Sequence, residues 1–382
     1  MTRTSARRSA SGTANVPLSR GWQRLALRDG QKGFTMLELL VALAITLALC
    51  GGLLVFVRLA AAAIRTQPER ADVQQRLRSA VETVVGRIEH AGAGPAAGGG
   101  TVPFAGRVPV IFPQRRGGTG ADAPMSAFQD RVTVYAVPEG GVLAALAQDV
   151  STTLAPLVLA PTPGCPLASP TCRFAVGDTV LVFDATGTHE IVSITGIGPD
   201  TLQHTAAVSK LYRTAMGAAV VSVDVRSIVF DAGASQLRIQ SPSGMNQPLA
   251  DNVVEFAMSY YGQTRAPAVP RPPPGEDGCL VDTAGVPKLP ALNPDWGALV
   301  QLQPGALSDG PACGSGAAAF DVDLFRVRQV RVSLRVQAGA ASYRGRWAAW
   351  FRRPGPQDDV RMMVPDGEVT VDVVLRHLAG GS

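Results

Sequence analysis

The chain has 382 residues, and its 35 Lys and Arg against 30 Asp and Glu give a net charge of +5. The basic excess is confined to residues 1–33, which hold seven basic side chains and one acidic one, so the rest of the chain has a net charge of −1. The overall charge therefore gives no case for nucleic-acid binding, which needs a basic surface on the folded protein.

The chain begins with a basic leader, residues 1–33, followed by an apolar segment over Leu37–Val57. A helix needs about 20 apolar residues to cross a bilayer, whereas the apolar region of a secretory signal peptide has roughly 7–15. We therefore expect a membrane-spanning helix over residues 37–57. Because positive charge favours the cytoplasmic side, the leader is expected in the cytoplasm and the rest of the chain on the other side.

One carboxylate, Glu38, lies at the start of this apolar segment, five residues after Gly33. A charge inside a membrane span is costly and is a functional-site hypothesis by default. Glycine has no side chain, so a protease can approach the Gly33 carbonyl closely. Glu38 needs a counter-charge, and a newly formed α-amine on a neighbouring chain would supply one. Glu38 is therefore expected to make an assembly contact.

The sequence from Lys32 to Leu40, KGFTMLELL, resembles the N-terminal signal of type IV prepilins and pseudopilins. The resemblance implies that a prepilin peptidase/methyltransferase cuts between Gly33 and Phe34 and methylates the new amine of Phe34. It also implies that Glu38 neutralises such an amine inside a filament. The alternative is an ordinary signal anchor with an incidental Glu at its edge.

An amphipathic half-helix follows over residues 68–90, so the N-terminal helix as a whole is predicted over residues 34–90. Its apolar residues recur at intervals of three and four: Val73, Leu77, Val81, Val84 and Ile88. This spacing is typical of a helix that buries one stripe against a domain. The sequence around Pro68 indicates either a helix restart or a continuation with a kink, because proline is tolerated in a first turn.

Residues 91–382 are predicted to form a β-rich head, because apolar and polar residues alternate in many short segments. The expected strands are Arg131–Val137, Thr179–Asp184, Glu190–Thr195, Ala219–Phe230, Gln236–Gln240, Asn252–Tyr261, Phe325–Gln337 and Glu368–Arg376. The fold class is therefore α+β: a long N-terminal helix packed on an antiparallel sheet. Residues 231–235 are expected to join two strands as a hairpin, and the Pro- and Gly-rich stretch 263–319 to be a large irregular loop.

The cysteines are consistent with an oxidising compartment. Cys50 lies in the apolar segment, which leaves Cys165, Cys172, Cys279 and Cys313 in the head. Four cysteines allow three pairings. The short loop and the flanking strands favour Cys165–Cys172 and Cys279–Cys313, with the second disulfide stapling the large loop.

The sequence gives little reason to expect an enzyme, a cofactor or a metal site. The four histidines are scattered without metal-ligand spacing, and the common catalytic motifs are absent. His189, beside Glu190, is expected to be structural. Asp321 and Asp323 could contribute to a calcium site, but a solvated strand start is the favoured interpretation. The arginines and aromatic residues between Tyr343 and Arg353 are interpreted as a solvated strand-and-loop face.

Several later segments resemble PilW-type minor pilins, with the J-type pseudopilin of type II secretion as a near neighbour. These segments are Arg76–Gly92, Phe174–Asp184, Ile228–Gln240, Pro248–Tyr261, Val327–Val336 and Val371–Arg376. The resemblance implies a type IV pilin-like fold and assembly, with other minor pilins and the major pilin, into a pilus tip or initiation complex that could display an adhesin. It places the precursor in the inner membrane and the assembled protein on the cell surface. The alternatives are a type II secretion pseudopilin and a signal-anchored periplasmic binding or enzymatic domain.

Overall fold

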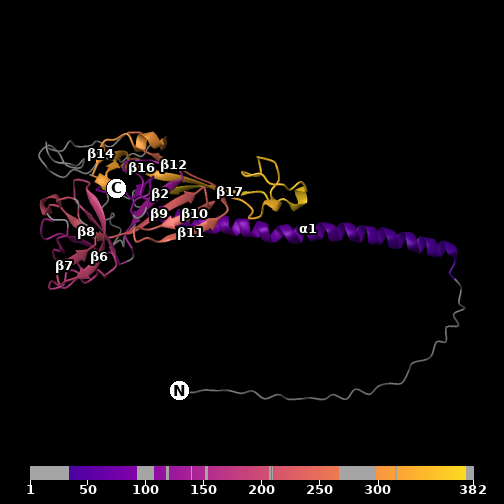
Figure 1. The fold of residues 1–382 in the computed structure, drawn as a ribbon, viewed down its shortest axis with the longest axis horizontal. Coiled ribbons are helices and arrows are strands. Elements are labelled where there is room, and N and C mark those ends of the chain that lie inside the picture. The colour runs from indigo at the N-terminus through magenta and orange to yellow at the C-terminus, as the bar shows by residue number, and fades with distance from the viewer. Residues whose placement is uncertain are drawn as a thin grey trace, which may run out of the picture. The chain divides into compact units, whose positions relative to one another are not determined.

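The computed structural model describes residues 34–92, 107–117, 120–138, 140–150, 154–205, 208, 210–265, 298–314 and 316–375. The chain divides into two compact units, Met1–Leu59 and Ala60–Ser382. One helix, α1, contributes to both units and runs over Met36–Glu89, passing through Pro68 without interruption (Figure 1). Of the two interpretations of the sequence around Pro68, the helix restart is wrong; the continuation of the helix is confirmed, while the expected kink stays a prediction.

Within its described residues, the head contains three antiparallel sheets of four or more strands and one two-stranded ribbon. The first sheet has the strand order β1-β2-β9-β10-β11, formed by Ile111–Phe112, Arg131–Ala136, Asp224–Asp231, Gln236–Gln240 and Asn246–Asp251. The second has the order β13-β12-β16-β17, formed by Val300–Leu302, Val253–Gly262, Val327–Val336 and Gly367–Val374.

The third sheet has six strands in the order β3-β8-β5-β6-β7-β4. They are Leu143–Ala145, Ala219–Ser222, Thr179–Phe183, His189–Ile197, Thr201–His204 and Leu157–Val158. The ribbon pairs β14, Ala312–Cys313, with β15, Phe320–Asp321. The 3-10 helices are η1 Thr214–Met216, η2 Pro304–Leu307, η3 Gly316–Ala318, η4 Val322–Arg326, η5 Ala341–Tyr343 and η6 Val360–Met362.

The second half of α1 packs on the head through one buried stripe. Val73, Ala80, Val84 and Ile88 are buried and join the same core as the strands of the first two sheets. Leu77, together with Val81, lies at the margin of the stripe and is only partly buried. Three of the five residues in the predicted stripe, Val73, Val84 and Ile88, are thus buried, and the structure adds Ala80, whose small side chain lets the helix lie close to the strands.

The central strand β5 of the six-stranded sheet is buried on both faces, and its successive side chains point to opposite sides of the sheet. In β5, Leu181 and Phe183 belong to the core shared with α1. Val180 and Val182 belong to a second core. The head therefore has two layers of packing, and only the first involves the helix.

Most predicted strands are present, with three corrections. The single strand expected over residues 219–230 is two strands, β8 and β9, which lie in different sheets. Strand β11 was missed because Pro248 interrupts the pattern; it lies at a sheet edge, where proline is tolerated. The stretch 263–319, expected to be an irregular loop, supplies β13, which pairs with β12. Residues 266–297 of that stretch lie outside the described residues.

Candidate functional site

The predicted processing site lies where the described structure begins. Gly33 is outside the described residues, while Phe34 is 88% exposed. Thr35 precedes the first residue of α1, Met36. The side chain of Phe34 is therefore not buried by the described residues, and it lies before the helix begins.

Glu38 and Thr35 form a reciprocal cap on the first turn of α1. The Thr35 backbone N–H and hydroxyl both donate to Glu38 Oε2, each at 3.0 Å. The Glu38 N–H donates in return to Thr35 Oγ1 at 3.3 Å. This arrangement is a capping box, in which the N-cap Thr and the third helical residue satisfy each other's backbone groups. The sequence Thr35-Met-Leu-Glu38 contains this signature, which the sequence-based expectation for Glu38 missed.

The capping box fixes where the Glu38 carboxylate lies and leaves part of it open. Oε2 accepts both hydrogen bonds, whereas Oε1 accepts none from the described part of the chain. Between Glu38 and Arg58 the sequence has no other Asp, Glu, Lys or Arg. An unneutralised carboxylate is thus held at the start of an apolar helix, with one oxygen free to meet a cation from another molecule.

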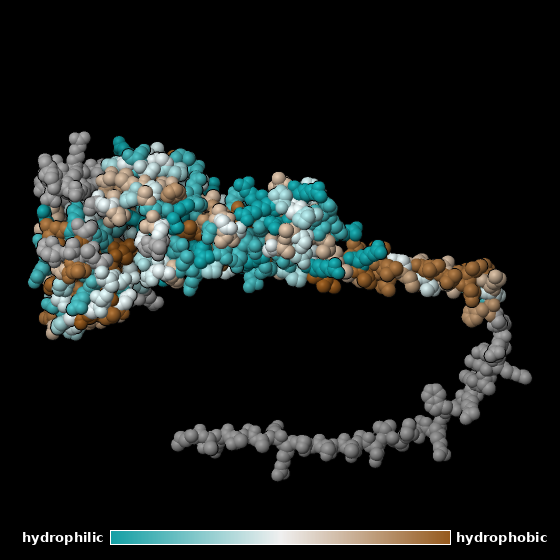
Figure 2. Space-filling view, in the orientation of Figure 1, coloured by the Kyte–Doolittle hydropathy of each residue, from teal (hydrophilic) through white to brown (hydrophobic). Residues whose placement is uncertain are grey.

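The helix that follows Glu38 exposes its apolar side chains. Leu39, Ile45 and Phe56 are each more than half exposed. Figure 2 shows hydrophobic residues, in brown, along this N-terminal part of α1. The helix is long and apolar enough to cross a membrane, and none of its most apolar window is buried within the protein. This surface is suited to lipid or to the helices of other chains.

One of the two predicted disulfides lies within the described residues. Cys165 and Cys172 form a disulfide with a Cα–Cα distance of 5.8 Å. Cys313 is disulfide-bonded, and Cys279, its predicted partner, lies outside the described residues. Cys50 is a free cysteine exposed on the apolar half of α1.

The three described histidines do not form a common site. Each ring lies against a different backbone carbonyl: His90 on Gly86, His189 on Gly187 and His204 on Ala155. His377 lies outside the described residues.

His189 is a buried structural partner of Arg116. Its Nε2 accepts from Arg116 Nη1 at 3.0 Å, and Arg116 also donates to the carbonyls of Ala317 and Ala319. Burial, reinforced by the nearby guanidinium, lowers the pKa of His189 to about 3. His189 is therefore neutral at pH 7. Arg116, His189 and Glu190 line a cavity of about 450 Å³.

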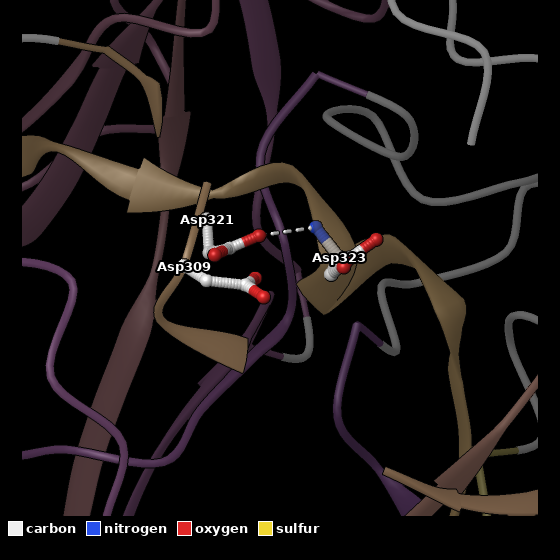
Figure 3. Close-up of side chains that lie close together, drawn as sticks. All are labelled: Asp309, Asp321 and Asp323. Carbon is white, nitrogen blue, oxygen red and sulfur yellow. Dashed lines mark hydrogen bonds between the residues drawn. The ribbon is translucent and has the colours of Figure 1, made fainter. Parts of the chain in front are cut away.

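Asp321 and Asp323 are buried, so the expectation of a solvated strand start is wrong. Asp321 Oδ1 accepts from the Asp323 N–H at 2.8 Å (Figure 3). Its Oδ2 accepts from the Gly310 N–H at 2.6 Å. Asp321 thus caps η4 and secures the preceding loop. Asp323 pairs with Arg326 at 3.2 Å.

Asp309 brings a third carboxylate to the same place, with one oxygen of each group within 4.8 Å of the others. Burial raises the pKa of both Asp321 and Asp323. Carboxylate oxygens are the ligands that calcium prefers, but the two buried carboxylates already serve a helix cap and an ion pair. Their arrangement is explained by the loop that they hold together.

Comparison with known proteins gives one match, and it falls on the N-terminal site. Residues 28–54 match the family model of the prokaryotic N-terminal methylation motif. Neither the curated proteins nor the solved structures give a significant match. The matched segment contains Gly33, Phe34, the capping box and most of the exposed apolar helix. It marks the chain as a type IV pilin- or pseudopilin-like precursor, which implies processing by a prepilin peptidase and assembly with other pilins.

Proposed function

We propose that this protein is a minor pilin of a type IV pilus. The peptidase cuts after Gly33 and methylates Phe34, and α1 then joins the helices of the major pilin and other minor pilins at the pilus tip. The head lies in the periplasm before assembly and on the cell surface afterwards, where it supports an adhesin. The methylation motif at residues 28–54 supports a pilin-like precursor, and the proposal adds a particular place in the filament.

The open oxygen of Glu38 carries this proposal. A carboxylate buried among apolar helices without a partner costs several kcal/mol. The methylated amine of Phe34 on a neighbouring subunit offers a matching positive charge. Because Glu38 is the one carboxylate between Phe34 and Arg58, the pairing favours a single register between subunits, and the capping box holds Glu38 in place for it.

The two-core head supports a minor rather than a major role. The second core, built around Val180, Val182 and Tyr212, packs without any residue of α1. This second core enlarges the head but adds no buried contact between the head and α1. Such bulk is hard to repeat in a close helical lattice, but it is tolerated at a tip, where copies are few.

The test compares three variants in a piliated strain. Glu38→Gln keeps a capping-box side chain, since Glu and Gln both serve at this position, but it removes the charge. Glu38→Ala removes both the capping side chain and the charge. Thr35→Val removes the threonine hydroxyl and keeps the Glu38 charge. We expect all three to be cleaved, but only Thr35→Val and the wild type to enter sheared filaments. Normal incorporation of Glu38→Gln would contradict the charge-pairing role.

A deletion strain separates the pilus from the secretion alternative. We expect loss of the chain to reduce surface pili while leaving secreted proteins unchanged. Intact piliation with lost secretion would instead identify a pseudopilin. If both processes were unaffected, neither assembly role would hold.

A further inference from the structure

The loop between β16 and β17, residues 337–366, is tied to α1 at three points. The Tyr343 hydroxyl donates to the Arg65 carbonyl at 3.4 Å, and the Gly339 N–H donates to Glu69 Oε1 at 2.6 Å. Arg70 Nη2 donates to the Met363 carbonyl at 3.1 Å. In Figure 1 this β16–β17 loop is the yellow segment beside α1. It lies against residues 65–70 of α1, which follow the apolar segment closely in sequence.

The β16–β17 loop presents two tryptophans to solvent from a fixed position. Trp347 is 48% exposed and Trp350 is 44% exposed, and their rings meet edge to face with centroids 5.2 Å apart. The next residue, Phe351, is fully buried and closes the turn through its N–H, which donates to the Trp347 carbonyl. The tryptophans are thus held outward between the buried Phe351 and the Tyr343 contact.

The charge of the β16–β17 loop is positive, with five arginines and three aspartates between residues 337 and 366. One of these aspartates, Asp366, is buried and paired with Arg335 at 3.0 Å. Arg361 is exposed, and its side chain makes no ion pair with the described residues. Arg346 pairs with Asp358 at 3.3 Å, but both side chains are 75% exposed, so water screens this pair strongly.

The point where this loop contacts α1 follows the apolar segment closely in sequence. Arg65, to which Tyr343 is bonded, lies eight positions after Val57, the last apolar residue of the predicted span. The headgroup layer of a bilayer begins where the hydrocarbon core ends. Trp347 follows Tyr343 by only four residues, so few residues join the predicted span to the tryptophans along this path.

We propose that the β16–β17 loop binds the surface of the membrane that holds α1, with Trp347 and Trp350 among the lipid headgroups and its arginines on anionic phosphates. Tryptophan favours the membrane–water interface because its ring is apolar and its N–H is polar. Basic residues within a Debye length of an anionic leaflet are attracted to it. This contact requires only that the apolar segment lies in a bilayer, so it does not depend on a role in a pilus.

The test uses the full chain in vesicles of phosphatidylcholine, with or without phosphatidylglycerol. The chain has four tryptophans, and replacing Trp22 and Trp296 by Phe leaves only the pair. Lipids brominated along their acyl chains quench tryptophans that lie at the membrane surface. We expect the pair to lose emission in brominated vesicles, and to lose more when phosphatidylglycerol is present. Emission unchanged by bromination would overturn the proposal.

A matched control places one tryptophan elsewhere on the head. Leu167 is 84% exposed and lies within the Cys165–Cys172 loop, so Leu167→Trp can be made in a chain whose four native tryptophans are Phe. We expect its emission to be unaffected by bromination. Equal quenching at both positions would show that the head settles on lipid without using this loop, which would also overturn the proposal.

A second variant tests the arginines. Arg346→Gln combined with Arg361→Gln changes two exposed side chains that hold no buried contact. We expect the extra quenching caused by phosphatidylglycerol to disappear, while the quenching in phosphatidylcholine remains. An undiminished response to the anionic lipid would refute the electrostatic part of the contact.

Discussion

The two halves of α1 differ in where their apolar side chains find partners. In the first half, Leu39 and Ile45 are mostly exposed. In the second half, Val84 and Ile88 are completely buried against the strands of the head. The apolar surface of the second half is covered by its own chain, whereas that of the first half requires lipid or another subunit. The second half of α1 thus packs on the head, and the first half offers an interface for assembly.

Charged side chains in the head also differ from Glu38 at the start of α1 in where they find partners. In the head, the Arg116 guanidinium donates to His189 and to backbone carbonyls, and Arg87 pairs with Asp224 at 2.8 Å. At the start of α1, Glu38 has hydrogen bonds to Thr35 but no basic partner in the described structure. Arg116 and Arg87 therefore have partners within the chain, whereas the Glu38 carboxylate has one oxygen without a partner among the described residues.

The largest expected effect comes from the same substitution made in each half of the helix. Ile88→Ala removes a fully buried side chain and should lower the free energy of unfolding of the head by about 2–5 kcal/mol. Ile45→Ala, at a position 56% exposed, should leave it unchanged. Urea unfolding of the detergent-solubilised chain, followed by near-ultraviolet circular dichroism, measures both. Equal losses of unfolding free energy in the two variants would contradict this difference between the two halves of α1.

A second prediction concerns the acid sensitivity of the head. The pKa of His189 is lowered from 6.5 to about 3, so between these values the unfolded chain binds a proton that the folded head does not. Stability should therefore fall as pH falls through this window, by up to about 1.4 kcal/mol for each pH unit.

His189→Gln is the matched variant, because its side-chain oxygen can still accept from Arg116 but does not titrate. Thermal unfolding between pH 7 and pH 4 should show a shallower loss of stability for the variant than for the wild type. Parallel profiles would mean that His189 is not held neutral by burial and the guanidinium.

The smallest expected effect concerns the ion pair between Arg87 of α1 and Asp224 of β9. Arg87 and Asp224 are 42% and 25% exposed, so solvent screens their attraction. A double-mutant cycle with Arg87→Gln and Asp224→Asn should give a coupling free energy below about 1 kcal/mol. A coupling well above that value would show that ion pairing, rather than the buried stripe, holds the helix on the head.

The sequence predicted the features that depend on local pattern. The apolar segment, the helical spacing from Val73 to Ile88, the hairpin at residues 231–235 and the Cys165–Cys172 disulfide each follow from residues close together in the chain. The Thr35–Glu38 capping box was equally local and was within reach of sequence reasoning.

The features that were missed depend on distant contacts. Apolar residues alternate smoothly from β8 into β9, so nothing in the pattern marks the change of sheet at Val223. Asp321 and Asp323 resembled a solvated strand start, because their burial depends on the Gly310 loop and Arg326 folding over them. Similarly, the sequence around His189 does not show that Arg116 will lie against it.

The most direct test of the account is the N-terminal mass of the protein recovered from its own cells. Cleavage after Gly33 and methylation should give a chain that begins with N-methyl-Phe34. An intact leader, or a terminus at any other residue, would contradict the assignment of a prepilin-like precursor.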